Sequence, residues 1–269
     1  MKKIVLALLI AVVAFTFVGC PKVYGDLDID WDSAEGGNEA FGVATIDTTK
    51  GEPSEEQRRG MRFLATKHTD LACKVEIEDV TAAGGSTMGL AFAQESEKVE
   101  EASKDAKGND ITVTKEYMDF ALVGFNVQNG KVVYYVSVYK DVDADKLSDN
   151  NFGAVANATT GAREVVIKDF TITAITPADN KVAVDITVDE DEQGNYIVTF
   201  ANGDNSYTVD IPYTAFDNRD GKSGVQGYTG FYANVYANKA LKGKWTVTDI
   251  EGNPIPLEWA DTEANPLIK

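Results

Sequence analysis

The chain has 269 residues with 25 basic and 43 acidic side chains, which gives a formal net charge of −18 at pH 7. This excess of negative charge argues against binding to nucleic acid or to anionic lipid head groups, because both would be repelled. Hydrophobic residues make up 43% of the chain. That content is enough for a packed core and disfavours global disorder. The single histidine, His68, leaves little room for histidine-based chemistry.

The chain opens with a basic and then an apolar segment. Lys2 and Lys3 precede a run from Ile4 to Val18 that only Thr16 interrupts. As a helix, this run spans roughly 22 Å at ~1.5 Å per residue, which is short of the ~30 Å hydrocarbon core of a bilayer. The segment is therefore typical of a cleaved export signal rather than of a permanent membrane helix.

The end of this segment, Phe17-Val18-Gly19-Cys20, resembles the lipobox of bacterial lipoproteins, although Phe17 stands where leucine is more usual. The resemblance implies cleavage before Cys20 and lipidation of its thiol. Two or three acyl chains, at ~0.8 kcal/mol per buried methylene, would anchor the protein almost permanently. The alternative is an ordinary secretory signal followed by an incidental cysteine.

The lipobox predicts a division of the chain into three parts. Residues 1–19 form the signal peptide, 20–38 the lipidated cysteine and a polar tether, and 39–269 a single domain. The mature chain, without its two leading lysines, keeps 23 basic and 43 acidic side chains and a formal charge of −20. We therefore expect an exported protein held at the cell envelope, in the outer membrane or at the cell surface, through its lipid alone.

Alternation of apolar and polar residues predicts strands along most of the chain. In Leu71–Glu78, Cys73 and its alternate neighbours are apolar and the residues between them are polar, which predicts a half-buried antiparallel strand with the thiol in the core. Asn129-Gly130 lies between two apolar runs and favours a type I′ hairpin turn. The remaining strands are predicted around Met88–Phe92 and at Phe120–Val127, Val132–Tyr139, Glu164–Thr173, Val182–Val188, Tyr196–Ala201, Ser206–Tyr213, Phe231–Ala237 and Lys244–Ile250.

Two segments are predicted not to be strands. Residues 95–110 hold six acids and three lysines, which indicates a solvated excursion or a short exposed helix. Glu55–Arg62 is the best candidate for a short helix. Ten to twelve strands without alternating helices predict an all-β, antiparallel β-sandwich.

The C-terminal half suggests which kind of sandwich this is. Tyr196–Gly203, Gly227–Val235 and Gly243–Ile250 follow one another with the spacing of a hairpin, a glycine-rich strand and a closing strand. Over roughly residues 60–250 this order resembles the concanavalin A-like jelly-roll sandwiches of lectins, laminin-G domains and glucanases. The resemblance implies a concave sheet that binds a glycan or a protein, or that carries a glycosidase site.

Tyrosines supply the candidate glycan site. Tyr135 and Tyr139 share one face of their strand, and Tyr232, Asn234 and Tyr236 share a face of another. Together on a concave sheet, these side chains would form an aromatic platform with a neighbouring amide. The alternative is that the tyrosines pack within the sandwich with their hydroxyls at its rim.

Acidic loops supply a candidate metal site, because Ca²⁺ prefers oxygen ligands. Asp217 and Asp220, with the loops 141–145 and 189–192, have compatible spacing but no EF-hand pattern. In so acidic a chain such clusters also arise by chance. No other cofactor is predicted.

The candidate catalytic groups are the carboxylates of a single strand. Glucanases of this superfamily place three acids in an E-x-D-x-x-E pattern; here Glu76 and Glu78 are followed by Thr81 at the last position. The sequence therefore favours a non-catalytic, lipid-anchored binding protein for a glycan or for a host or envelope protein. A secreted glycoside hydrolase and a structural envelope lipoprotein are the alternatives.

Overall fold

A computed structural model of the chain describes residues 39–49, 58–68, 70–128, 131–143, 162–167, 177–216 and 227–259. The predicted signal peptide, Cys20, the tether and the start of the domain at residue 39 therefore stay predictions, since residues 1–38 lie outside these ranges. Within the described ranges, the structure contains no helix of the length and hydrophobicity that a membrane crossing requires. The helical elements there are two short 3₁₀ turns, η1 (Glu39–Phe41) and η2 (Tyr213–Ala215).

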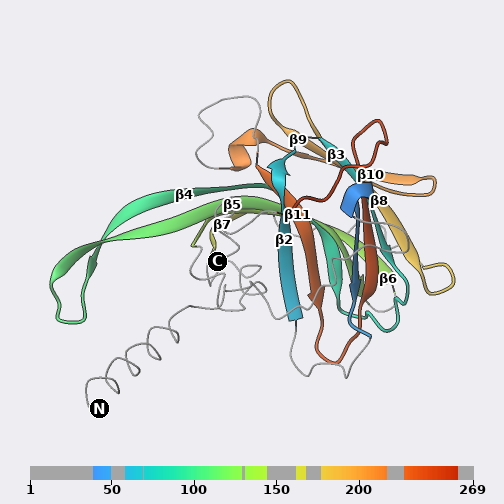
Figure 1. The fold of residues 1–269 in the computed structure, drawn as a ribbon, viewed down its shortest axis with the longest axis horizontal. Coiled ribbons are helices and arrows are strands. Elements are labelled where there is room, and N and C mark those ends of the chain that lie inside the picture. Colours follow the sequence, from blue (N-terminus) through green and yellow to red (C-terminus); the bar gives the residue numbers. More distant parts are fainter. Residues whose placement is uncertain are drawn as a thin grey trace, which may run out of the picture.

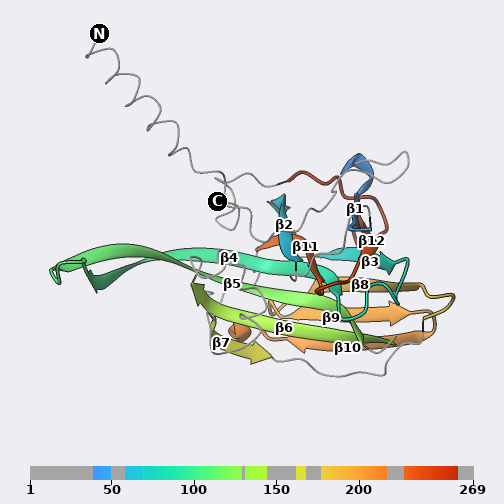
Figure 2. The same cartoon turned by 90° about the horizontal axis from the view of Figure 1, so that it is seen from below.

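In the described ranges, twelve strands form two six-stranded sheets (Figures 1 and 2). Sheet A contains, in spatial order, β1 (Val43–Asp47), β12 (Lys242–Thr248), β3 (Leu71–Ile77), β8 (Val182–Glu190), β9 (Tyr196–Asn202) and β10 (Asn205–Ile211). Sheet B contains β2 (Arg58–Lys67), β11 (Tyr228–Val235), β4 (Thr87–Lys104), β5 (Asp110–Gln128), β6 (Lys131–Asp143) and β7 (Ala162–Ile167). Every neighbouring pair is antiparallel. The prediction of an all-β antiparallel sandwich is confirmed.

The core lies between the sheets and follows from the alternation in sequence. On β3, β8 and β9 the residues alternate between buried and more exposed, so one face of each strand enters the core. Cys73 is buried on β3, as predicted, and burial raises the pKa of its thiol far above the usual range. Contacts that join the two sheets include the stacking of Tyr134 on Phe200, with 4.7 Å between ring centroids.

The predicted hairpins are confirmed. β5 and β6 pair from Val127–Val132 to Phe120–Tyr139, and the turn residues 129–130 lie outside the described ranges. β9 and β10 pair directly around Gly203 and Asp204.

The short helix predicted at Glu55–Arg62 is wrong, and the excursion predicted at residues 95–110 is built from strands. Glu55–Arg62 was predicted as a helix, but β2 begins at Arg58 and pairs with β11. Residues 95–110 run through β4 to Lys104 and into β5 at Asp110, with one ladder between them. Figures 1 and 2 show β4 and β5 continuing past the other strands as a two-stranded ribbon, so the expected solvated excursion is a projecting hairpin.

Candidate functional site

The outward-facing side of sheet B carries the side chains that are not part of the core. On β4, Met88 and Leu90 point into the core, so Thr87, Gly89 and Ala91 lie on the outer face. The same parity places Tyr232 and Asn234 of β11 outward, together with every second residue of β5 and β6. This surface is the outer face of sheet B.

A row of four residues crosses this face from β11 to β6. Tyr232 lies opposite Gly89, Gly89 opposite Gly124, and Gly124 opposite Tyr135. Three strand spacings of ~4.8 Å separate the backbones of the two tyrosines. Their ring centroids are nevertheless 6.5 Å apart, with an edge-to-face angle of 79°. The two rings therefore lean toward each other above the glycines, and we call this set the tyrosine–glycine row.

The glycines are required by the close approach of β4 and β5. A Cβ atom added at Gly89 would lie 2.1 Å from the carbonyl oxygen of Val123, and one at Gly124 would lie 2.3 Å from that of Met88. No larger residue fits without moving a backbone. The floor between the tyrosines is therefore bare of side chains.

A polar row runs beside the tyrosine–glycine row. Asn234 lies opposite Thr87, and Thr87 opposite Asn126. The Asn126 side-chain amide donates to Thr87 Oγ1 at 2.8 Å, while its buried Oδ1 has no partner in the structure. Exchanging the two ends of the amide would leave its nitrogen unpaired instead. One end of this amide is thus buried without a hydrogen-bond partner.

Exposure on this face is greatest along the polar row. Asn126 and Asn234 are half-buried there, and Tyr135 is half-buried in the next row. One row farther on, the face is closed, because Leu122 and Ser137 are buried. Within the tyrosine–glycine row, Tyr135 is therefore the partly exposed member, while Tyr232, Gly89 and Gly124 are buried.

The structure brings only some of the predicted site residues together. Tyr135, Tyr232 and Asn234 lie in the two adjacent rows. Tyr139, four residues farther along β6, is buried and stacks on Phe120 with 4.8 Å between ring centroids. Tyr236 follows the end of β11 and is 51% exposed. The predicted binding role of these residues stays a prediction.

Gly89, Gly124, Thr87 and Asn126 were not among the predicted site residues. The available signal was a lone glycine inside each of two strand patterns, since such a glycine marks a place where another backbone comes close. Thr87 and Asn126 carry no such signal.

The strand carboxylates considered for hydrolysis are ion-paired. Glu76 contacts Lys244 with 2.6 Å between their charged atoms, and Glu78 contacts Lys242 at 2.7 Å. Both lysines come from β12, the neighbour of β3 in sheet A. The hydrogen bond from Lys242 to Glu78 raises the pKa of this lysine. These pairs form a charged outer surface of sheet A.

The predicted calcium ligands Asp217 and Asp220 lie outside the described residues. Among the residues that are described, no three carboxylate, histidine or cysteine side chains are grouped so as to hold a metal ion. The calcium site stays a prediction.

The chain matches no family model and no curated protein. A toad ovary galectin bound to thio-digalactose is similar to it at 10% identity and a TM-score of 0.31, over 71% of this chain and 98% of the galectin. The lectin UEA-II complexed with galactose has 9% identity and a TM-score of 0.36, over 83% of this chain and 91% of the lectin.

Two enzymes of the GH43 class are also similar. One is a glycoside hydrolase engineered to display both endo-xylanase and exo-arabinofuranosidase activity, with 9% identity and a TM-score of 0.35 over 78% of this chain. The other is a bifunctional GH43-CE protein of Bacteroides eggerthii, with 13% identity and a TM-score of 0.35 over 77% of this chain. This chain spans 34% and 21% of their lengths. At these identities and TM-scores, the four likenesses carry no argument about its ligand or activity.

Proposed function

We propose that this protein is a lipid-anchored, non-catalytic component of the bacterial envelope that binds a neutral glycan on the outer face of sheet B. The observation that carries the proposal is the tyrosine–glycine row, with its two facing tyrosines and the half-satisfied amide of Asn126 beside it. The lipobox-like segment ending at Cys20 supports the anchor.

A sugar suits this surface in its shape and its polarity. A tyrosine ring offers an apolar face to the C–H side of a sugar ring, and amides exchange hydrogen bonds with its hydroxyl groups. Tyr135 is the partly exposed ring of the pair, since Tyr232 and the two glycines beneath the rings are buried.

The absence of charge in these rows favours a neutral glycan over an anionic one. Three adjacent rows across β11, β4, β5 and β6 hold only uncharged residues, in a chain whose net charge is −18. The surrounding negative field would repel carboxylated or sulfated sugars.

The first experiment applies the detergent-solubilised full chain to a glycan array and, in parallel, to mixed polysaccharides. We expect retention on neutral glycans and no release of reducing ends. Turnover that survives repurification would instead support the glycoside hydrolase. A flat array together with one discrete protein partner in cross-linking would support a structural envelope lipoprotein.

The anchor has its own test. Replacing Cys20 with serine should move the protein from the membrane fraction to the soluble one and leave its melting temperature unchanged. A chain that stays in the membrane fraction after its signal is cleaved would show that the lipid is not the anchor.

A further inference from the structure

The projecting part of the β4–β5 hairpin is a separate surface from the proposed glycan site at the tyrosine–glycine row. β11 pairs with β4 only as far as Gln94, and β6 pairs with β5 from Tyr117 onward. No other described strand pairs with β4 beyond that point or with Asp110–Glu116 of β5. We call residues 98–115 the arm.

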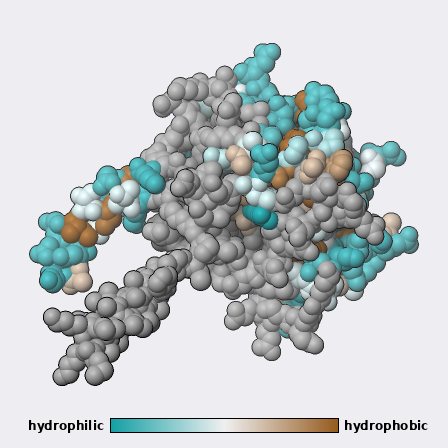
Figure 3. Space-filling model, viewed as in Figure 1, coloured by the Kyte–Doolittle hydropathy of each residue, from teal (hydrophilic) through white to brown (hydrophobic). Residues whose placement is uncertain are grey.

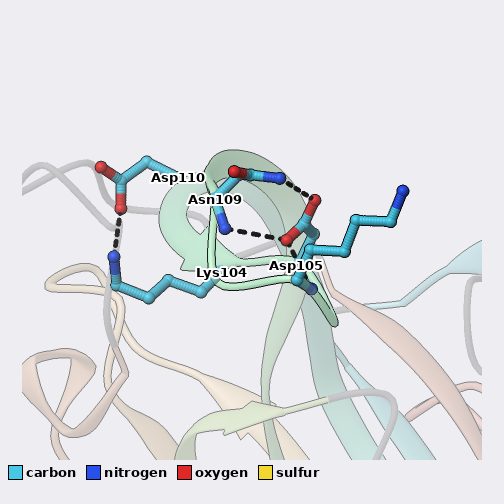
Figure 4. A network of polar contacts seen from close by, with 5 residues as sticks. Lys104, Asp105, Asn109 and Asp110 are labelled. Carbon is cyan, nitrogen blue, oxygen red and sulfur yellow. Dashed lines mark hydrogen bonds and ion pairs between the residues drawn. The ribbon is translucent and has the colours of Figure 1, made fainter.

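Hydrogen bonds and one ion pair fix the tip of the arm (Figure 4). Asp105 accepts hydrogen bonds from the backbone N–H and the side-chain amide of Asn109, both at 2.8 Å. Gly108 supplies the positive φ of the turn, +84°. Lys104 and Asp110 form an ion pair of 2.6 Å. The arm is therefore a defined hairpin up to its end.

A two-stranded ribbon of this kind needs a further layer or strand. An isolated hairpin is marginally stable in water, and three or more strands with a shared apolar face are required for independent stability. One face of the arm carries Val99, Ile111 and Val113, of which Ile111 is 39% exposed. In Figure 3 apolar residues stand among hydrophilic ones along this projection. The open edges and this stripe fit an additional strand.

The charge of the arm differs from that of the whole chain. Four lysines and four carboxylates lie between residues 98 and 115, so the arm is formally neutral while the chain carries −18. Two whole molecules repel each other. Contact through two neutral arms would hold the acidic bodies well beyond the ~8 Å screening length of physiological salt.

We propose that the arm pairs with the arm of a second copy of this chain, β5 against β5, in antiparallel register about Val113. In that register Val113 meets Val113 of the other copy and Thr112 meets Thr114, and both kinds of pair stabilise sheets. The result is a four-stranded sheet with two-fold symmetry, in which the two Val113 side chains meet on the axis and Ile111 of each copy lies opposite Lys115 of the other. Asp110 would face Glu116, but it is already ion-paired with Lys104.

The opposite edge of the arm is a poor alternative. Antiparallel pairing of β4 with β4 about residue 101 would set two Glu101 carboxylates against each other on the two-fold axis, where the β5 pairing places two valines. Like charges that face each other directly destabilise a sheet. The β5 edge is therefore the self-complementary one. This inference does not depend on glycan binding.

Cross-linking in membranes tests the register. In the full chain, Val113→Cys should form a disulfide-linked dimer on mild oxidation, while Ser103→Cys should not. Ser103 lies on the same face of the arm but on β4, opposite Ile111. Thr112→Cys and Thr114→Cys chains made together should cross-link with each other faster than either does with itself. Equal cross-linking of the Val113 and Ser103 variants, or linkage of Val113→Cys to a different protein, would overturn the proposal.

Sedimentation of the detergent-solubilised full chain tests the association itself. The unaltered chain should be a dimer at micromolar concentration, and Val113→Lys a monomer, because two like charges would then meet on the two-fold axis. Ser103→Lys should remain a dimer. Both variants should melt at the temperature of the unaltered chain, since the arm lies outside the sandwich. A monomeric unaltered chain, or equal effects of the two lysines, would contradict the model.

Discussion

Trp245 connects the core to the outer face of sheet B through a single hydrogen bond. It is fully buried on β12 of sheet A, where its ring lies 5.4 Å from that of Phe231. Its indole N–H donates to the carbonyl of Gly89, at 2.9 Å. Gly89 belongs to the tyrosine–glycine row, so the inner side of that row is fixed by a residue of the opposite sheet.

Replacing Trp245 should therefore be costly even when the ring is kept. Trp245→Phe retains an aromatic ring but leaves the Gly89 carbonyl without its donor, which should lower the free energy of unfolding by about 1–3 kcal/mol. Trp245→Ala should lower it by about 3–5 kcal/mol. Urea denaturation of both variants measures the difference. A Trp245→Phe chain with the midpoint of the unaltered protein would mean that the hydrogen bond contributes nothing.

At the scale of elements, one five-residue turn recurs three times. Asp105–Asn109, Asp191–Asn195 and Asp249–Asn253 share the pattern D-x-x-G-N. In each, the aspartate accepts hydrogen bonds from the backbone and the side chain of the asparagine, which lowers the pKa of the carboxyl. The glycines have φ of +84°, +83° and +90°. The pattern D-x-x-G-N is therefore a tight-turn signal in this chain.

Residues 95–110 were not predicted as strands because both faces of this hairpin are exposed to solvent. Both faces of the arm meet water, so the alternation that identifies a half-buried strand is missing there. The helix predicted at Glu55–Arg62 failed for a different reason, because pairing of β2 with β11 outweighs local preference. Strands with one buried face, such as β3 and β8, were predictable.

The candidate site was only partly predictable for a related reason. Alternation places Tyr135 outward on β6 and Tyr232 outward on β11. It does not give the register across a sheet in which β11 lies next to β4. That register puts Gly89 and Gly124 between the tyrosines, and it depends on contacts between residues far apart in the chain.

Asp189, on β8, gives a prediction for pH dependence. Partial desolvation of the exposed carboxyl, followed by a hydrogen bond with Asp70, raises the pKa of Asp189. The folded chain therefore binds this proton more tightly than the unfolded chain, so stability is lost as pH rises above 3.8, the ordinary pKa of an aspartate, toward the raised pKa of the folded state.

Asp189→Asn should remove this penalty. The melting temperature of this variant should be higher than that of the unaltered protein at pH 7. The two melting temperatures should converge at pH values below 3.8, where Asp189 is protonated in both the folded and the unfolded chain. Because Asp189 is largely exposed, screening should keep the gain below ~1 kcal/mol, or about 2–4 °C. Asp210→Asn, at an exposed position on β10, is the control. An equal gain at every pH would contradict the assignment.

At the scale of the whole molecule, charge distinguishes three regions, namely the acidic surface of the folded domain, the uncharged rows on sheet B and the neutral arm. The net charge of −18 opposes contact between the folded domain and an anionic surface, which leaves attachment to the lipid predicted at Cys20. The uncharged rows on sheet B and the neutral arm interrupt this negative field. The two proposed contacts, with a neutral glycan and with a second copy, both use these uncharged places.

The central claim is that the tyrosine–glycine row binds a sugar, and titration calorimetry tests it most directly. The full chain in detergent is titrated with the neutral oligosaccharide that the array retains best, beside Tyr135→Ala and Tyr236→Ala. Tyr135→Ala should weaken binding at least about fivefold, since a lost aromatic contact of this kind costs more than about 1 kcal/mol. Tyr236→Ala, which removes an exposed tyrosine beyond the end of β11, should bind as the unaltered chain does. Undiminished binding by a folded Tyr135→Ala chain, or equal losses in both variants, would contradict the account.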